Sequence, residues 1–429
     1  MKTLAFNINI HRYFLLKKYR FFDIGNDNYY FDDYTTHAML QQSENNCLRP
    51  ALEMLLALVR RYKKRVRFSV GVSGPALQMM EESCPDSLKL LQQLAATGCV
   101  EFTAQPYNYS LAGINDMDEF RRQVGLCVSE IKRLFNQEPQ TFQNTGLIYT
   151  DDIGKAVYDM GFKLVLVQSE KRSLDVKGTD YLYFHPDVQR LRILPLNVQY
   201  TELFEDVLKD KNLISAEGLV EQVSRNAAGG DVMFTYINID YLDNTKYNNR
   251  EVLSFVKTAV EKVLAERTFK FDTPSSVLQK CQPISPYKLP APVPGLNYTP
   301  NLYPWLGNEL QREAFSKINA LRDKVKIAGN ATLQSIWQRL QCSDYLYFMS
   351  DSYFSHDGQR LLPNPFDSPY NAFIAFMNIV GDFERRVDIS VESSDTDKLS
   401  DKQIADAIKY YQAKVKELKK EYQKRSMIV

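Results

Sequence analysis

Several features that mark common classes of protein are scarce or missing in this sequence. Its 429 residues include only four histidines, two tryptophans and six cysteines, and no two cysteines have the CxxC spacing. Zinc ribbons and thioredoxin-like chemistry depend on such pairs and are therefore disfavoured. Cysteines scattered in this way are typical of reduced, partly buried thiols in a cytoplasmic protein.

The sequence also lacks a strong charge and long apolar runs. Its formal net charge is +1, so no global field attracts the chain to nucleic acid or to an anionic membrane. No apolar run approaches the roughly 18 residues that span a bilayer, and the first residues alternate instead of forming a signal peptide. We therefore expect a cytoplasmic protein with no nucleic-acid partner and no membrane partner.

Alternating strands and helices are the main pattern that is present. Phe6, Ile8 and Ile10 alternate with polar residues, which predicts a first strand that ends at His11. Strand and helix patterns then follow one another to about residue 280, as expected for βα units around a parallel sheet. The number of strands in that length favours a barrel over an open sheet. The predicted fold class is α/β, with an all-helical C-terminal part.

The composition changes after the alternating region, which predicts the domain organisation. We expect a (β/α) barrel over residues 1–281, a proline-rich connector over 282–304, a helical domain over 305–390 and a charged C-terminal helix over 391–429. In the last segment, apolar residues are spaced 4-3-4-3-4 from Ile404 to Tyr422, which is a heptad seam. Two interpretations stay open: a long helix that lies on its own barrel, or a homodimer or partner helix through 404–422.

One segment resembles a known enzyme family. The run from Asn144 to Tyr149, followed by Asp151 and then by Ile153-Gly154, resembles the nucleophile segment of glycoside hydrolase family 57, the amylase and 4-α-glucanotransferase family. The family has its nucleophilic glutamate at the third position of this run, where this chain has Gly146. Further segments that resemble the family, most closely its shorter α-amylase-like branch, are 19–33, 98–102, 305–310, 343–350, 364–365 and 368–370.

The resemblance implies a fold and a set of site positions. The fold is an incomplete seven-stranded (β/α) barrel, followed by a helical domain that closes one wall of a sugar cleft. His11 stands where the family has the histidine of His-Gln-Pro, and either contacts a sugar hydroxyl or has a structural role. Glu101 matches a family glutamate, whereas Gln105 and Tyr109 replace the glutamate and histidine that usually follow it.

The positions of the two catalytic carboxylates are the most altered. A retaining glycosidase needs two carboxyl groups about 5–5.5 Å apart, one as nucleophile and one as acid. Gly146 has no side chain, and an ungapped register puts Asn238 at the acid position, with Asp240 two residues later on the same face of the strand. No catalytic residue is therefore assigned, and Asp240 is the one candidate carboxylate. In the helical domain, Asp344 and Tyr347 match family positions that could bind sugar or could serve as a helix cap and a core residue.

Three hypotheses follow from these positions. The first is a degenerate, non-catalytic relative that binds an α-glucan, such as a maltooligosaccharide, or a partner protein in carbohydrate metabolism. The second is an active hydrolase or glucanotransferase with relocated carboxylates, in which Asp240 is the acid and Glu101 or Asp151 the base. The third is a metal-dependent deacetylase, which is disfavoured because its metal needs clustered histidines. The four histidines, which are His11, His37, His185 and His356, are far apart in the sequence. We expect no cofactor and no metal.

Overall fold

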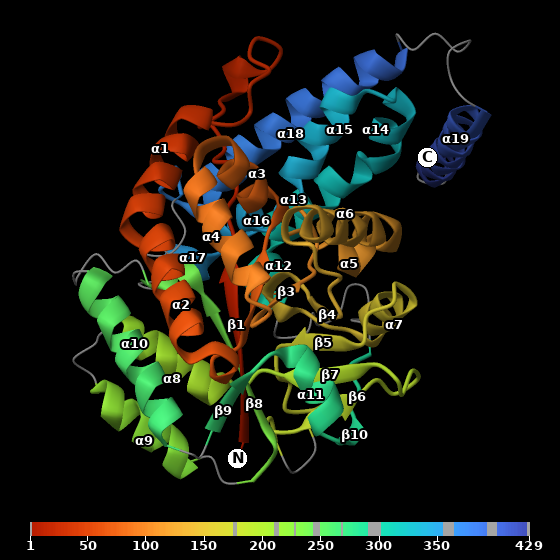
Figure 1. The fold of residues 1–429 in the computed structure, drawn as a ribbon. Helices are drawn as coiled ribbons and strands as arrows, with labels where there is room; N and C mark the ends of the chain where they lie inside the picture. Colours follow the sequence, from red (N-terminus) through yellow and green to blue (C-terminus); the bar gives the residue numbers. More distant parts are fainter. Residues whose placement is uncertain are drawn as a thin grey trace. The chain divides into compact units, whose positions relative to one another are not determined.

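The computed structural model forms two compact units. It describes residues 2–174, 178–209, 214–226, 229–242, 249–266, 269–290, 302–354, 364–392 and 401–426. The first unit comprises Met1–Phe14 and Asp33–Tyr303, and the second comprises Leu15–Asp32 and Pro304–Val429 (Figure 1). The domain boundaries predicted from the sequence stay a prediction, but residues 15–32, which were expected in the barrel, belong to the second unit.

The first unit contains every strand found among the described residues. They are β1 (Lys2–Ile10), β2 (Phe68–Val72), β3 (Val100–Thr103), β4 (Thr141–Gln143), β5 (Leu164–Val167), β6 (Leu182–Phe184), β7 (Arg192–Pro195), β8 (Val232–Asn238), β9 (Phe269–Asp272) and β10 (Pro283–Pro286). Its helices are α1 (Asp33–Ser43), α2 (Arg49–Tyr62), α3 (Gly74–Ser83), α4 (Pro85–Ala96), α5 (Ala112–Asn115), α6 (Met117–Phe135), α7 (Asp151–Asp159), α8 (Val198–Lys209), α9 (Ala216–Asn226), α10 (Asn249–Ala265) and α11 (Pro274–Lys280). A π-helical turn, Glu44–Leu48, joins α1 to α2.

Seven parallel strands form the barrel. One ladder runs β8-β1-β2-β3 and a second runs β4-β5-β7. A parallel bridge between Ala104 and Phe142 joins β3 to β4. On the other side, Asn197 follows β7, and its N–H donates to the carbonyl of Phe234 in β8 (2.8 Å). The expected incomplete seven-stranded (β/α) barrel with a helical C-terminal region is confirmed. β9 adds a strand beside β1, and β6 pairs antiparallel with β7.

Side chains alternate between the inside and the outside of the barrel, as the pleat of a strand requires. On β1, Leu4 packs in an apolar cluster with residues of α8, α9 and α10, whereas Ala5 packs in a second cluster with Val277 of α11. The alternation of residues that predicted β1 therefore matches the structure, in which successive side chains face the outer helices and the barrel interior in turn.

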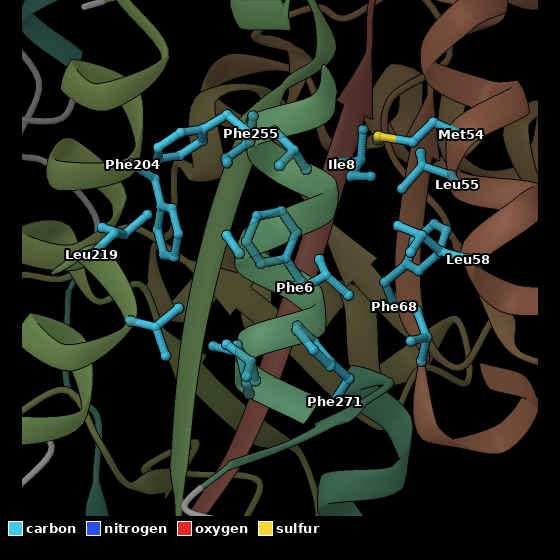
Figure 2. Close-up of a pocket in the computed structure, with 18 of the residues that line it drawn as sticks. Phe6, Ile8, Met54, Leu55, Leu58, Phe68, Phe204, Leu219, Phe255 and Phe271 are labelled. Atoms are coloured by element: carbon cyan, nitrogen blue, oxygen red, sulfur yellow. The ribbon is translucent and has the colours of Figure 1, made fainter. Parts of the chain in front are cut away.

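An apolar cavity of about 110 Å³ lies outside the barrel, between β1, β8 and β9 and the helices α2, α8, α9 and α10. Phe6 is central to it, and Phe204 and Phe271 lie nearby (Figure 2). The rings of Phe6 and Phe204 meet edge to face, with centroids 5.9 Å apart. The lining is almost wholly apolar, so this space belongs to the outer core and offers little to orient a sugar hydroxyl.

The second unit is helical. It contains α12 (Tyr303–Leu306), which begins at the last residue of the first unit, α13 (Glu309–Ala320), α14 (Arg322–Ala328), α15 (Ala331–Leu340), α16 (Asp344–Tyr347), α17 (Asp351–Phe354), α18 (Pro369–Glu392) and α19 (Asp401–Ser426). The segment 15–32 is fastened to α18, because Asp382 accepts hydrogen bonds from the N–H of Gly25 (2.6 Å) and the hydroxyl of Tyr30 (2.5 Å). Among the helices in the described part of the chain, none combines the length and the apolar character needed to cross a membrane.

Two local expectations differ from the structure. Between residues 168 and 200 the only apolar piece that stands out in the sequence is Arg192 to Leu194, which predicts an irregular segment around it. The structure instead has β6, β7 and the start of α8 there. The connector expected over 282–304 begins with β10, because Pro283–Pro286 pairs with β6. Residues 291–301 of that connector lie outside the described residues.

Candidate functional site

The loops at the carboxyl ends of the barrel strands bring three of the site positions together, one retained and two altered. His11 follows β1, Tyr109 lies in the loop after β3, and Gly146 lies in the loop after β4. The rings of His11 and Tyr109 are stacked, with centroids 3.9 Å apart and an angle of 21° between their planes. The N–H of Gly146 donates to the hydroxyl oxygen of Tyr109 (3.4 Å). The Tyr109 side chain therefore bridges His11 and Gly146.

The Gly146 loop has an unusual backbone. Gly146 has φ 57° and ψ 21°, and Leu147 follows it with φ 56°. The left-handed region costs a residue with a Cβ about 1–2 kcal/mol. The Asn144 side chain holds the loop, since it accepts from the N–H of Thr145 (2.9 Å) and donates to the carbonyl of Ile148 (3.0 Å). The loop is therefore fixed by its own hydrogen bonds although position 146 has no side chain.

Asp240, the candidate carboxylate, is held by an arginine. Arg12 follows β1 by two residues and Asp240 follows β8, which is the neighbour of β1 in the barrel. The guanidinium binds both carboxylate oxygens, at 2.8 and 2.9 Å, and the two side chains are only 13% and 12% exposed. Arg12 also donates to the hydroxyl of Ser43 (2.8 Å) and to the carbonyl of His11 (2.7 Å). Both oxygens of Asp240 are thus occupied by hydrogen bonds within the barrel.

The electrostatics of this pair favour the charged arginine. Burial alone would lower the pKa of the Arg12 guanidinium, but the charge and the hydrogen bonds of Asp240 outweigh burial and raise it. Asn238 lies two residues before Asp240 and its side-chain oxygen accepts the N–H of Asp240 (3.2 Å). The amide at 238 therefore supports the backbone that presents Asp240 to Arg12.

A network of buried amides fills the barrel beneath these loops. Gln143 hydrogen-bonds to Asn7, to Asn9 (3.2 Å) and to Gln105 (2.8 Å). Asn7 also accepts from the hydroxyl of Ser69 (2.6 Å). A core built in this way needs each buried polar group to find a partner, and it fixes the register of the strands that contribute to it.

The carboxylates of Glu101 and Asp151 accept hydrogen bonds from groups outside the His11–Tyr109 stack. Glu101 is the second residue of β3, inside the amino-terminal half of the barrel, and accepts from the hydroxyl of Thr141 (2.5 Å) and the N–H of Ser275 in α11 (3.0 Å). Burial raises its pKa, and these hydrogen bonds oppose the rise. Asp151 begins α7, where its carboxylate accepts the N–H of Leu289 (2.9 Å). Burial raises the pKa of Asp151, and this hydrogen bond opposes the rise.

The remaining candidates have contacts of their own. In the second unit, Asp344 begins α16 and accepts from the thiol of Cys342 (3.0 Å), whose pKa burial and the Asp344 charge raise well above its usual value. Tyr347 is half-buried, and its ring meets that of Tyr353 edge to face at 5.5 Å. The six cysteines are all buried.

The histidines have separate surroundings. His185 bonds through Nε2 to the carbonyl of Asp151 (2.8 Å), and its Nδ1 accepts from the backbone N–H of Asp187 and Val188 (both 3.1 Å). His185 therefore donates from Nε2 and accepts at Nδ1. His37 in α1 meets the hydroxyl of Ser83 (3.0 Å), and His356 lies outside the described residues.

Sequence reasoning missed the partner of Asp240. Arg12 and Tyr13 stand where the resembled family has the Gln-Pro that follows its histidine, and the resemblance assigned Arg12 no role. The signal was present, because a cation and an anion follow two strands that neighbour each other in a barrel. It also noted Tyr109 only as a replacement, without expecting that its ring would reach Gly146.

A barrel of seven parallel strands, with long loops at their carboxyl ends, places the chain among the (β/α)-barrel proteins. Within that class it belongs to glycosyl hydrolase family 57, a family of carbohydrate-active enzymes, because the family's sequence model matches residues 5–290, about two thirds of the chain. Over 417 residues it is 24% identical to a Methanocaldococcus jannaschii protein named provisionally as an alpha-amylase, covering 92% of this chain and 87% of that one.

Solved structures share the fold. A family 57 branching enzyme of Thermococcus kodakaraensis is 11% identical, with 94% of this chain and 93% of that chain covered and a TM-score of 0.65. The alpha-amylase AmyC of Thermotoga maritima is 10% identical, with 95% and 97% covered and a TM-score of 0.60. A 4-alpha-glucanotransferase of Thermococcus litoralis is 14% identical with a TM-score of 0.59, and the match covers 80% of this chain but only 56% of that enzyme.

Proposed function

We propose that this chain is a family 57 member without glycosidase activity, which binds an α-glucan or a partner protein in cytoplasmic carbohydrate metabolism. One observation carries the proposal. The hydroxyl of Tyr109 lies against the backbone N–H of Gly146, in the position that the resemblance gives to the nucleophilic glutamate, and the Tyr109 ring is stacked on His11. An aromatic side chain therefore fills space that a catalytic carboxylate and a reacting sugar would need.

The chemistry of the site supports the loss of catalysis. A covalent route needs a nucleophile, and Gly146 supplies none. General acid catalysis contributes roughly 10²–10⁴-fold, and the amide of Asn238 cannot deliver a proton as a carboxylic acid does. Without both groups, hydrolysis at ordinary amylase rates has no route through these positions. Binding through ring stacking and hydroxyl contacts does not need either carboxylate.

The second candidate function, an active hydrolase or glucanotransferase with relocated carboxylates, has weaker support. Both oxygens of Asp240 are engaged by Arg12. Glu101 lies two residues before the carboxyl-terminal end of β3, about 7 Å along the strand, and its carboxylate accepts from Thr141 and Ser275. Asp151 is occupied by the backbone of Leu289. An inverting pair would need two carboxyl groups about 6.5–9.5 Å apart, both facing one sugar.

Maltooligosaccharide hydrolysis by the purified protein tests the loss of catalysis. We expect no turnover above the buffer control. The matched variant is Tyr109→His, Gly146→Glu and Asn238→Asp together, which returns a smaller ring and two carboxyl groups to the site. Measurable turnover by this triple variant alone would support the assignment of the positions. Turnover by the unmodified chain at ordinary amylase rates would overturn the proposal.

Calorimetry separates the two kinds of ligand. We expect maltooligosaccharide binding that strengthens in Tyr109→Ala, because that change opens the space beside His11. Absence of binding heat in both proteins, for every α-glucan tried, would leave only the protein partner. Equal binding by both proteins would mean that the ligand binds away from Tyr109.

A further inference from the structure

The C-terminal helix α19 is long and nearly uncovered within one chain. Its 26 residues span about 39 Å at 1.5 Å per residue. Every side chain that the structure describes on it is exposed, except that of Tyr410, which is half-buried. Isolated helices are marginal in water, and most helices in proteins are stabilised by the packing of an apolar face. A partner that covers α19 would supply this stabilisation.

The exposed apolar residues of α19 form a seam, which consists of Ile404, Ile408, Tyr411 and Val415. These side chains are 37%, 52%, 52% and 50% exposed, respectively. Their 4-3-4 spacing averages 3.5 residues, the repeat that keeps one narrow stripe facing a partner helix in a two-stranded coiled coil. Leu418 and Tyr422 continue the same spacing in the sequence.

The partner of the seam is not α14 of the same chain. Tyr410 is the half-buried residue of α19, and its ring influences the pKa of Lys324 in α14. At 100° per residue, Tyr410 lies roughly 130° around the helix from the middle of the seam. Contact with α14 therefore covers a different face and leaves the seam available.

The charges of α19 favour a second copy of this chain in the antiparallel direction. Residues 401–408 carry two aspartates and one lysine, whereas residues 409–425 carry seven lysines and arginines and two glutamates. A parallel pair would set the two basic halves together, with Lys414 flanking the seam opposite Lys419 of the other copy. An antiparallel pair sets each basic half against the acidic start of the other helix, and the same patch then serves both copies.

We propose that α19 pairs antiparallel with α19 of a second copy, so that this chain forms a homodimer in solution. The centre of the pair lies near residue 413, so the helix backbone at residue 404 lies opposite the backbone at residue 422 of the other copy. This interface is additional to the proposed function and does not depend on it. It requires only the helix, the heptad seam and the charge asymmetry.

The mass of the full chain in solution tests the dimer. Light scattering coupled to gel filtration should give twice the 49.6 kDa of one chain. The seam variant Ile408→Glu with Val415→Glu should weaken the dimer by at least about a hundredfold, since each glutamate puts a charge in the apolar seam. The control variant Gln403→Glu with Ala413→Glu adds the same charge away from the seam and should stay dimeric.

Cysteine pairs test the direction. Parallel helices would let Ile404→Cys protein form a disulfide with itself. In the antiparallel pair, residues 404 of the two copies are about 27 Å apart, beyond the roughly 7 Å limit between bridged Cα atoms. We expect a disulfide only when Ile404→Cys and Tyr422→Cys proteins are mixed. Self-linkage of Ile404→Cys would overturn the antiparallel arrangement.

Two outcomes would overturn the dimer itself. One is a mass of 49.6 kDa at every concentration for the unmodified chain. The other is equal behaviour of the seam variant and its control. Monomers that bind vesicles of anionic lipid through α19 would identify a basic amphipathic membrane helix instead. Deleting residues 401–429 provides the monomer reference without a charged substitution in a helix.

Discussion

Replacing Arg12 with methionine tests the contact that occupies Asp240. The change removes two hydrogen bonds to the Asp240 carboxylate, at 2.8 and 2.9 Å, together with those to Ser43 and His11. Both side chains of the ion pair are less than one seventh exposed, so water cannot replace the lost guanidinium fully. Removing one partner of a buried pair typically costs about 3–5 kcal/mol, because the other charge is left without compensation. We expect a loss of that size for Arg12→Met.

Two further variants separate the ion pair from general damage. In Arg12→Met with Asp240→Leu, both charges are gone, and we expect at least half of the lost stability to return. Arg61→Met breaks the exposed pair with Glu261, in which the side chains are 62% and 33% exposed and the atoms 3.1 Å apart. An exposed pair of this kind contributes about 0–1 kcal/mol, so this variant is the matched control.

The assays are urea unfolding and hydrogen exchange of the backbone amides of β1 and β8. Arg12→Met should lower the urea midpoint and speed exchange in these two strands. Equal midpoints for Arg12→Met and Arg61→Met would refute the buried ion pair. So would a double variant no more stable than Arg12→Met alone. Arg12→Met should also stay inactive on maltooligosaccharides, since releasing Asp240 does not supply the nucleophile missing at Gly146.

Three further outcomes follow from single side chains. Burial raises the pKa of Glu44 above its usual 4.5, so the folded protein binds this proton more tightly than the unfolded chain does. The contribution of Glu44 to the free energy of unfolding therefore falls as the pH rises above about 4.5. Urea midpoints measured from pH 4 to 7 should therefore fall less steeply in Glu44→Gln than in the unmodified chain, and an equal slope would contradict this. Gly71→Ala should lower the free energy of unfolding by about 1–3 kcal/mol, since a Cβ there would overlap the buried amide of Gln143. In the control Gly125→Ala the added Cβ meets nothing within 4 Å, and this change should stabilise α6 by about 0.5–1 kcal/mol. Ala259→Val adds two methyl groups beside the 110 Å³ apolar cavity and should raise the free energy of unfolding by about 1 kcal/mol; a loss would mean that the cavity is already filled.

The barrel was accessible to sequence reasoning because its strands repeat a simple period. The end of β1 was predicted to within one residue, since apolar alternation is a local signal. No local signal indicates that residues 15–32 belong to the second unit, because their partners, such as Asp382, lie more than 350 positions away. The buried amides of Asn7 and Gln143 were also beyond reach, because isolated polar residues in strands look the same whether they face water or each other.

The candidate site was only partly predictable for a related reason. The resemblance located Gly146, Asn238 and Asp240. These positions show that the nucleophile is missing and that the acid position has an amide. Tyr109 and Arg12 occupy the surroundings of the two missing catalytic carboxylates. Their positions depend on tertiary contacts, which no local sequence pattern predicts. A charged residue two positions after a buried strand was the available hint for Arg12.

The backbone of the Gly146 loop decides how hard it would be to restore catalysis. Leu147 keeps a left-handed conformation because its side chain packs in the barrel core with Leu164 and Leu166, so the surrounding structure determines the path of the loop. The glutamate of Gly146→Glu would inherit φ 57° at position 146, at a cost of about 1–2 kcal/mol, and would meet the hydroxyl of Tyr109. Gly146→Glu alone should therefore be both less stable and inactive, whereas Tyr109→His beside it should relieve the collision. If Gly146→Glu alone hydrolysed maltooligosaccharides, Tyr109 would not block catalysis. The missing glutamate side chain at position 146 would then by itself explain the absence of hydrolytic activity.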